Sequence, residues 1–560
     1  MLGRERVLDG LLLIGLLVGL PALGGLGWAV LQNPFFADLP WLALPFFVLG
    51  GLAILRRRWA VAILFDLCGL GWAGAAWLAP AGPAPVELLV YGVDGATFDV
   101  IDAHPKELPA FTRLRQEGSR AVLNSIEPMF SPVLWTTIAS GRSPDEHGIR
   151  GFHVRSSDCR VARFWDVAED AGWRIGLYKW LVDYPPREVA GFWVPSWLAP
   201  APETWPSTLM AVKEVELSRR LRRKQVAQEH GDGELLMALI PIGVRLSTLV
   251  QAALWTVEDR LLQPDLVRKN VAMQLLRGRM DRDVFVRQLY QEKPRLATFT
   301  YYATDGLAHL YWDRYVQGED ELLSAYIQAD SILAELRSHL GPRARLILVS
   351  DHGFQAMDGS GLAGQFAPTT ERLKQRLSEK IGPVDVSKVG HKLTVALQSA
   401  QQREALGPVL ATLVDREGDP VYRVEEIPEN QLSLALTLVD ERISAERLQH
   451  DQVGGEPLSD YVRLTDAYTG THEGRGVFYA VGAGIPQGKE LDALSLYDVA
   501  PTILAAAGLP ASEQMRGKAA LFPELPRVQT WDHLIPGLSW LDGKQGVNEE
   551  QLKVLGYMEP

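Results

Sequence analysis

Two short segments of the chain each place a carboxylate close to an imidazole. The apolar run from Leu346 to Ser350 ends in Asp351 and His352, and elsewhere Asp305 and His309 are four positions apart. Residues spaced by four face the same side of a helical turn, so this second pair can point at a common ligand. Carboxylate oxygens and imidazole nitrogens are ligands for divalent metals such as zinc. Because polar groups directly after a core strand are costly to bury without a partner, we interpret both segments as metal-binding. A hydrogen-bonded Asp–His pair is the structural alternative.

Three further residues give weaker signals by themselves. Asp94 ends an apolar run as part of an Asp-Gly pair, which marks a turn more often than a ligand. His472 lies in a polar segment, and a single histidine in a loop usually has no special role. Ser131 precedes Pro132, a pair typical of a helix amino terminus, so Ser131 is predicted to be the N-cap. The same position would surround its hydroxyl with backbone N–H groups that favour a phosphate.

These residues need a scaffold that brings distant segments of the sequence to one place. Short apolar strands alternate with amphipathic helices, which predicts an α/β fold with a doubly wound, mostly parallel sheet and helices on both faces. In such sheets, ligands bind at the carboxyl ends of the strands. The predicted strands are Glu87 to Val93, Leu296 to Ala303, Arg345 to Ser350 and Gly476 to Val481. The predicted helices are Leu108 to Glu117, Ser131 or Pro132 to Ser140, Glu319 to Leu340 and Asp498 to Ala507.

Two stretches interrupt this alternation of strands and helices. Residues 201–291 are predicted to form a helical insertion, and residues 382–431 a small α+β cap. The insertion contains a basic run, Ser218 to Lys224. This run either contacts anionic lipid headgroups or substrate, or it is simply a solvated helix face.

The first 80 residues are much more apolar than the rest of the chain. They contain three apolar runs, Leu11 to Leu31, Leu39 to Leu55 and Trp59 to Leu78, each close to the roughly 20 residues that span a bilayer. Arginines precede the first run and separate the second from the third, which places the amino terminus in the cytoplasm. The sequence therefore predicts a three-helix anchor in the cytoplasmic membrane, residues 1–80. Residues 81–560 are expected on the extracytoplasmic, periplasmic side.

The remaining residues have a clear charge imbalance. Residues 81–560 carry 51 basic and 64 acidic side chains. An acidic excess disfavours contact with a phosphate backbone, so no nucleic-acid binding is expected. Of the two cysteines, Cys68 lies in a predicted span and Cys159 outside it, so we expect no disulfide between them.

Together and in this order, the motifs resemble those of the alkaline phosphatase superfamily, specifically its type I phosphodiesterase/nucleotide pyrophosphatase-like branch. The resemblance runs from about Val86 to Leu509, apart from the two insertions. Its most specific parts are Ser131 to Ile149, which ends in Gly-x-x-Pro-x-x-His-Gly-Ile, and the strand end at Asp351 to Gly353. The resemblance implies a phosphoric ester hydrolase, either a phosphodiesterase or a phosphatase.

By position, the resemblance also implies two divalent metal ions, which members of this family take as zinc or, less often, manganese. One metal would be held by Asp305, His309 and His472, and the other by Asp94, Asp351, His352 and the Ser131 oxygen. Ser131 would be the nucleophile, made reactive by the metals, and would form a covalent phosphoserine that water hydrolyses.

Two other functions stay open on the sequence. A phosphotransferase that moves a lipid headgroup would use the same nucleophile, and the predicted anchor makes a lipid-linked phosphate ester and the lipid bilayer natural partners. A catalytically silent scaffold protein would have lost a metal ligand, and none of the six ligand positions is missing. A sulfatase needs a Cys/Ser-x-Pro-x-Arg motif, which Ser131 and Pro132 do not supply.

Overall fold

The computed structural model describes residues 82–221, 238–262, 264–356, 366–389, 392–416, 418–424, 433–438, 447, 451–464 and 469–543. The three predicted membrane spans, and Cys68 with them, lie outside these ranges. Within the described ranges, no helix is long and apolar enough to cross a membrane. Two compact units are present. One holds residues 85–226, 265–278 and 292–560, and the described part of the other holds residues 82–84, 238–262, 264 and 279–291.

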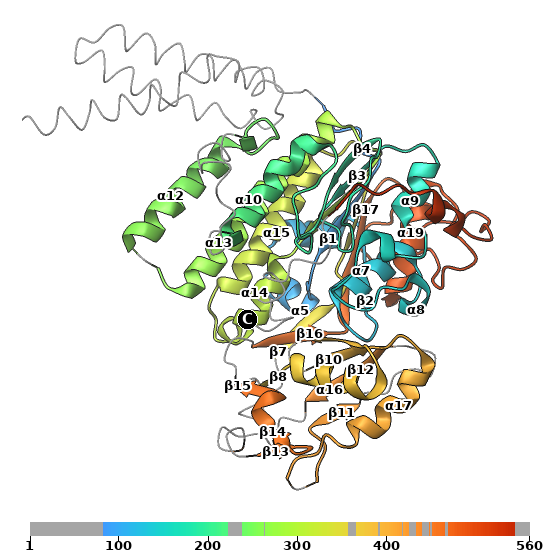
Figure 1. The fold of residues 1–560 in the computed structure, drawn as a ribbon. Helices are drawn as coiled ribbons and strands as arrows, with labels where there is room; N and C mark the ends of the chain where they lie inside the picture. Colours follow the sequence, from blue (N-terminus) through green and yellow to red (C-terminus); the bar gives the residue numbers. More distant parts are fainter. Residues whose placement is uncertain are drawn as a thin grey trace, which may run out of the picture. The chain divides into compact units, whose positions relative to one another are not determined.

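The larger unit is built on a nine-stranded sheet (Figure 1). Its strands, in spatial order, are β18 (Lys489–Glu490), β2 (Ser119–Asn124), β17 (Arg475–Gly482), β6 (Arg345–Val349), β1 (Leu88–Val93), β5 (Leu296–Tyr301), β3 (Ile175–Tyr178) and β4 (Gly191–Val194), with β19 (Leu494–Ser495) paired to β2. Only β17 runs antiparallel to its neighbours. The predicted mostly parallel α/β sheet is therefore confirmed, and its central strand β1 is buried along its whole length, as strands covered on both faces are.

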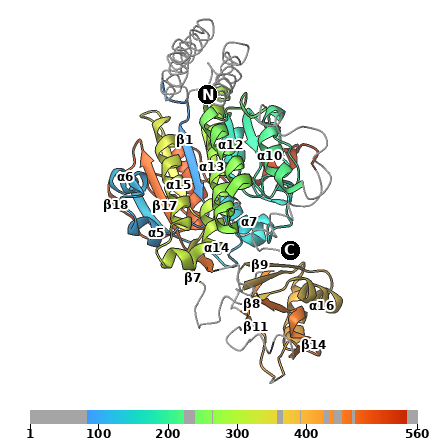
Figure 2. The same cartoon turned by 90° about the vertical axis from the view of Figure 1, so that its left-hand side faces the viewer.

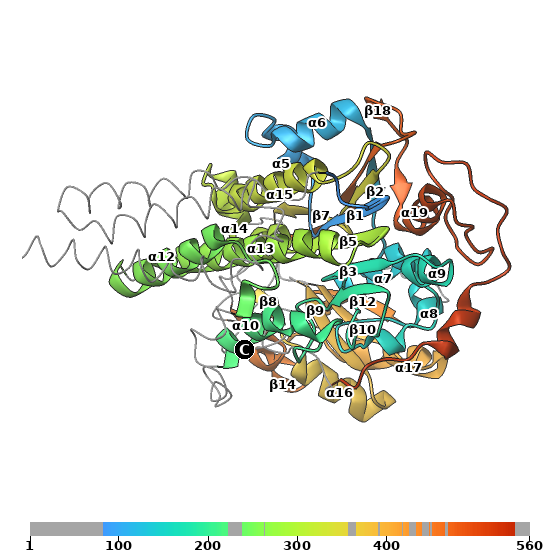
Figure 3. The ribbon, with the colours of Figure 1, turned by 90° about the horizontal axis from the view of Figure 1, so that it is seen from above.

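Helices cover both faces of this sheet (Figure 3). On one face, α7 (Ser131–Ser140), α9 (Phe164–Asp170) and α19 (Val499–Ala507) share one hydrophobic core with the strands. On the other face lie α6 (Pro109–Glu117) and α15 (Glu321–Ser338), and Figure 2 shows α15 in front of β1. The Tyr91 hydroxyl of β1 donates to the Ala329 carbonyl of α15. The helix α14 (Ala303–Val316) packs against α15.

The predicted strands and helices of the sheet end within two residues of the observed ones. The clearest difference is at the end of β5, which stops at Tyr301, so that Ala303 begins α14 instead of ending the strand. A propensity pattern does not locate this turn, because the Tyr301–Ala303 segment is apolar throughout and suits a strand as well as a helix.

The insertion is helical, as its sequence predicts. It contains α10 (Met210–Leu221), α12 (Leu246–Leu262) and α13 (Leu266–Gln291). The basic run falls at the end of α10 and continues beyond the described residues.

The cap is larger than the predicted segment 382–431. Its antiparallel sheet has the order β11 (Tyr422–Val424), β12 (Ser433–Leu438), β10 (Lys392–Ala396) and β9 (Asp385–Val389). Two helices, α16 (Glu371–Ile381) and α17 (Ala400–Leu410), accompany this sheet. The cap's hydrophobic core starts at Leu373 and reaches Val462. It includes α16 because the apolar face of this helix is buried against the cap's sheet.

One glycine allows the closest approach between β1 and α7. A Cβ atom at Gly92 would lie 2.6 Å from the Cη2 atom of the Trp135 indole. We predict that Gly92→Ala displaces Trp135 and lowers the thermal unfolding midpoint, since overpacking a core costs about 1–3 kcal/mol. The matched control is Gly537→Ala, where a Cβ would meet nothing within 4 Å. Equal midpoints for the two variants would contradict the predicted tight contact.

Candidate metal centre and nucleophile

The ligand candidates come from three neighbouring strands of the large sheet. In the order β6, β1, β5, these strands end at the same edge. Asp94 follows β1, Asp351 and His352 follow β6, and Asp305 lies in the first turn of α14, directly after β5. This adjacency brings together residues that are more than 250 positions apart in the sequence. It is the carboxyl edge at which ligands were expected.

His472 reaches the same place through a separate two-stranded ladder. The short strand β7 (Gly353–Ala356) leaves the site and pairs antiparallel with β16 (Gly470–Glu473), so that His472 lies opposite Phe354. The sequence predicted a loop around His472, and the structure shows a strand there.

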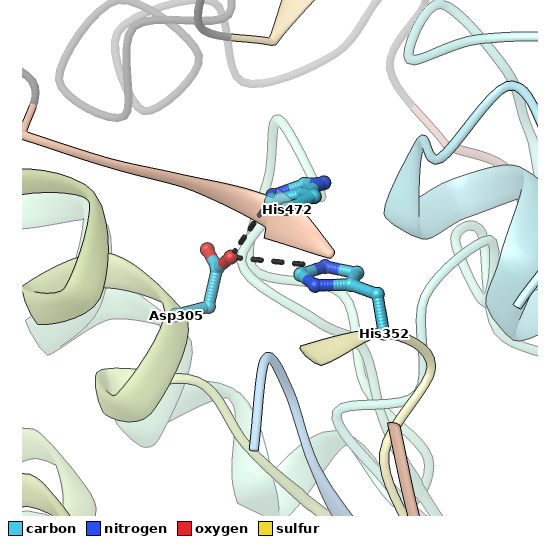
Figure 4. Close-up of side chains that lie close together, drawn as sticks. All are labelled: Asp305, His352 and His472. Atoms are coloured by element: carbon cyan, nitrogen blue, oxygen red, sulfur yellow. Dashed lines mark ion pairs between the residues drawn. The ribbon is translucent and has the colours of Figure 1, made fainter. Parts of the chain in front are cut away.

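The first group of ligand atoms surrounds the Asp305 carboxylate. Its Oδ1 atom is 3.3 Å from His472 Nε2, 3.4 Å from His309 Nε2 and 3.8 Å from His352 Nε2. Figure 4 shows the Asp305 carboxylate pointing toward His472 and His352. The two nitrogens His309 Nε2 and His472 Nε2 are 3.1 Å apart. Four candidate ligands therefore converge on one point.

The second group shares His352 with the first. His352 Nε2 is 3.5 Å from Asp94 Oδ1 and 3.5 Å from Asp351 Oδ2. The donor atoms of Asp94, Asp351 and His352 all lie within 4.8 Å of one another, as do those of Asp305, His352 and His472. The sequence assigned His309 to the first group, and its Nε2 atom is indeed beside Asp305, while His352 bridges both groups.

The imidazoles are oriented by the backbone. The Nδ1 atom of His352 lies 2.9 Å from the Gly353 carbonyl oxygen, that of His472 lies 2.9 Å from the Met129 oxygen, and that of His309 lies 3.3 Å from the Gly470 oxygen. A carbonyl oxygen only accepts hydrogen bonds, so each Nδ1 carries the proton. Each Nε2 then faces the carboxylates, the orientation that metal-binding histidines use.

Four donor atoms of this cluster are buried without a hydrogen-bond partner: Asp94 Oδ1, Asp305 Oδ1, Asp351 Oδ2 and His352 Nε2. Buried polar atoms are nearly always paired, because losing water without compensation is costly. A set of carboxylate oxygens and imidazole nitrogens that lacks partners in this way fits divalent cations, with zinc and manganese both compatible.

The electrostatics of the protein groups alone lead to the same conclusion. Burial, with the nearby Asp351 and Asp305 carboxylates, raises the pKa of Asp94 well above its usual value. Burial and Asp305 likewise raise the pKa of Asp351. Burial would also raise the pKa of Asp305, but its neighbours His309 and His472 more than offset this and lower it. Burial lowers the pKa of His472 to about 3, which keeps this imidazole neutral. Bound cations would relieve the repulsion among the carboxylates.

Ser131 is the first residue of α7, and Phe130 is the N-cap, so the predicted capping role of Ser131 is wrong. The Ser131 hydroxyl is buried and has no hydrogen-bond partner. Two contacts fix its segment against the ligand cluster. Two residues before it, the Met129 carbonyl accepts from His472, and one turn after it, the Trp135 indole donates to Asp94 Oδ2 at 3.0 Å. Ser131 is therefore held between ligands of both groups.

Two other polar residues near the motifs have structural partners. The Nδ1 atom of His147 accepts from the Ile149 N–H, and burial lowers the pKa of His147 to about 3. The Lys179 ammonium lies 3.0 Å from Glu216 Oε2 in a buried ion pair.

Two supporting residues carry no signal in the sequence. Trp135, which binds Asp94, sits in an apolar helix segment and looks like a core residue. Ser350 accepts from the Ala96 N–H and donates to the His352 carbonyl, and so ties together the loops that follow β1 and β6. Their roles depend on contacts across the sheet, which a local pattern does not contain.

A mostly parallel α/β sheet whose carboxyl edge holds two overlapping sets of metal ligands is the architecture of a metal-dependent hydrolase. Residues 88–443 match the sequence model of the type I phosphodiesterase / nucleotide pyrophosphatase family, and the chain belongs to this family. It is therefore a phosphoric ester hydrolase of a metal-dependent family. The matched segment includes every ligand candidate except His472. A search of curated proteins found no significant match.

The cluster predicts opposite effects of one substitution with and without metal. Asp94→Asn removes one of three mutually repelling carboxylates, so we expect it to raise the unfolding midpoint of the chelator-treated protein. Saturating zinc should stabilise the unsubstituted chain by about 4 kcal/mol at a thousandfold excess over Kd, and the variant by clearly less. Differential scanning calorimetry measures both.

The control for this experiment is Asp99→Asn, which changes an exposed carboxylate in the helix α5 (Phe98–Ala103). It should leave both midpoints unchanged. If Asp94→Asn lowered the metal-free midpoint and left the zinc effect intact, the cluster would not be a metal site.

Proposed function

We propose that this phosphoric ester hydrolase uses Ser131 as its nucleophile and forms a covalent phosphoserine during turnover. The observation that carries the proposal is the state of the Ser131 hydroxyl, which is buried without a hydrogen-bond partner. Its chain segment is held to ligand candidates on both sides, through His472 and Asp94. Because buried hydroxyl groups are almost always hydrogen bonded, an unpaired one in this position suits a reacting group.

The residues that would hold the metals form two sets. Asp305, His309 and His472 would hold one ion, and Asp94, Asp351, His352 and the Ser131 oxygen the other. When bound, the two ions supply positive charge that lowers the pKa of the serine hydroxyl and stabilises charge on the phosphoryl oxygens. The mixed carboxylate and imidazole set supports zinc, with manganese as the alternative.

The chain's own groups position the reaction. The Trp135 indole occupies Asp94 Oδ2 and leaves Oδ1 facing His352. The amino terminus of α7, where Ser131 lies, has a partial positive charge that favours the anionic phosphoryl group.

The covalent steps balance as two displacements at phosphorus. The Ser131 oxygen gives up its proton and attacks phosphorus, and the bond from phosphorus to the leaving oxygen breaks, so that the leaving oxygen takes up a proton and departs as the alcohol. Water then attacks the same phosphorus and the bond to the Ser131 oxygen breaks. One proton of the water restores the serine hydroxyl, and a diester substrate leaves as its phosphate monoester.

We propose phosphodiesters as the preferred substrates. A phosphate monoester brings a second negative charge, and the buried Lys179 ammonium already pairs with Glu216. The family match supports the same preference.

The test is the hydrolysis of bis(p-nitrophenyl) phosphate and of p-nitrophenyl phosphate by the zinc-loaded full chain. Ser131→Ala should lower kcat/KM on the diester by about 10³-fold or more, and the unsubstituted chain should prefer the diester. Acid quenching during turnover of the diester should leave a p-nitrophenyl phosphoryl group on the peptide that contains Ser131.

The matched control is Ser140→Ala, at the other end of the same helix, where the hydroxyl donates to the Thr136 carbonyl. Its activity should remain within a fewfold of the unsubstituted chain. Full activity of Ser131→Ala, or a phosphorylated peptide elsewhere, would refute the serine mechanism.

We also propose that the chain is anchored in the cytoplasmic membrane, with the hydrolase on its extracytoplasmic side. The support is in the sequence, namely the three apolar runs in residues 1–80 and the position of the flanking arginines. A lipid-linked phosphodiester would then lie within reach of the enzyme.

Cysteine labelling tests this orientation. A thiol introduced by Val424→Cys, at a half-exposed position in β11, should react with a membrane-impermeant maleimide on intact spheroplasts. A thiol introduced by Gly3→Cys should react only after lysis. Labelling in the reverse order would place the hydrolase in the cytoplasm.

A further inference from the structure

The helix α12 carries an unusual share of the exposed apolar side chains. Eight large hydrophobic side chains are exposed among the described residues, and four of them belong to α12. Val250 is 47% exposed, Leu254 63%, Leu261 76% and Leu262 72%. Single exposed hydrophobic residues are ordinary on protein surfaces, but a group of them on one element marks an interaction site.

Three of these residues form one stripe. At 100° per residue, Val250, Leu254 and Leu261 point within about 40° of one another along α12. The opposite side of the helix faces the protein, where Thr248 is buried and donates to Asp283 of α13. The stripe of Val250, Leu254 and Leu261 is therefore the outer face of a helix that is attached by its inner face.

The charge of the insertion differs from that of the rest of the chain. Residues 201–291 carry 14 basic against 11 acidic side chains, whereas residues 81–200 and 292–560 together carry 37 basic against 53 acidic. An anionic surface would therefore attract the insertion and repel most of the remaining protein.

Gly82, the first residue that the structure describes, contacts the last turn of α13. The Tyr290 hydroxyl, in the last turn of α13, donates to the Gly82 carbonyl at 3.4 Å. Gly82 is only four positions after Leu78, where the third predicted span ends, so this chain segment reaches at most about 14 Å. The start of α12 is hydrogen bonded to α13 about two turns before Tyr290. There the Arg245 N–H and the Thr248 hydroxyl both donate to Asp283.

We propose that α12 lies on the bilayer surface, with Val250, Leu254 and Leu261 inserted among the lipid chains at the headgroup boundary. The apolar stripe is covered by the anionic lipid leaflet that the third predicted span enters. Interfacial helices bind in this way, by an apolar face together with neighbouring positive charge. This inference rests on the proposed membrane anchor and is independent of the proposed serine mechanism.

The experiment measures lipid contact at single positions. The full chain, with Cys68→Ser and Cys159→Ser, receives one thiol by Leu254→Cys, Leu261→Cys or Val316→Cys and is labelled with an environment-sensitive fluorophore. Val316, on α14, is 69% exposed and serves as the control. The proteins are reconstituted into vesicles of phosphatidylcholine and phosphatidylglycerol, with ordinary or brominated acyl chains, and isolated by flotation. Phosphodiesterase activity confirms that each variant is folded.

We expect brominated lipid to quench the fluorophore at positions 254 and 261 and to leave position 316 unaffected. If brominated lipid left the emission at all three positions the same as ordinary lipid does, the proposal would be overturned. Protection of positions 254 and 261 from aqueous iodide without bromine quenching would also overturn it, because protein, either residues 1–81 or a second copy, would then cover the stripe. Failure of the unlabelled chain to float would instead refute the anchor, and this inference with it.

Discussion

The burial of three carboxylates together at one sheet edge is the constraint around which this protein is arranged. Asp94, Asp305 and Asp351 lie out of water, and burial and mutual repulsion push the pKa of Asp94 and Asp351 upward. Protein groups alone do not relieve this cost, because four donor atoms of the cluster have no hydrogen-bond partner among the described residues. Divalent cations bound here would offset the repulsion among the carboxylates, so metal binding would also stabilise this part of the protein.

Backbone geometry makes this arrangement of charges specific. The carbonyl oxygens of Gly353, Gly470 and Met129 fix the three imidazoles, and the ladder of β7 with β16 fixes two of those carbonyls. The third carbonyl belongs to the segment that leads into α7, so the position of Ser131, the proposed nucleophile, is coupled to that of a ligand candidate. Trp135 couples the other end of that helical turn to Asp94. Small repacking beneath α7 would therefore disturb the metal centre and the serine together.

The cap and the helical insertion are each stabilised separately from the large sheet. The cap has its own hydrophobic core from Leu373 to Val462, and it meets the segment after the Ser131 motif where Arg150 donates to the Leu397 carbonyl. The helix α12 of the insertion belongs to the smaller unit and exposes its apolar side. All ligand candidates thus lie at one sheet edge. The cap and α12, which face the surroundings of the sheet, contribute none of them.

The sequence by itself determined the local features. It predicted four strands and four helices to within two residues, the Asp-His pair after β6 and the helical pair of Asp305 and His309, because short-range periodicity encodes each of them. Only the tertiary structure decided that β1 lies between β6 and β5, that β16 carries His472 into the cluster, and that Phe130 instead of Ser131 caps α7. The cap's true extent also emerged only there. The physical reason is sequence distance: the contact from His472 to Met129 spans 343 positions, and no local pattern records which distant segments share a sheet edge.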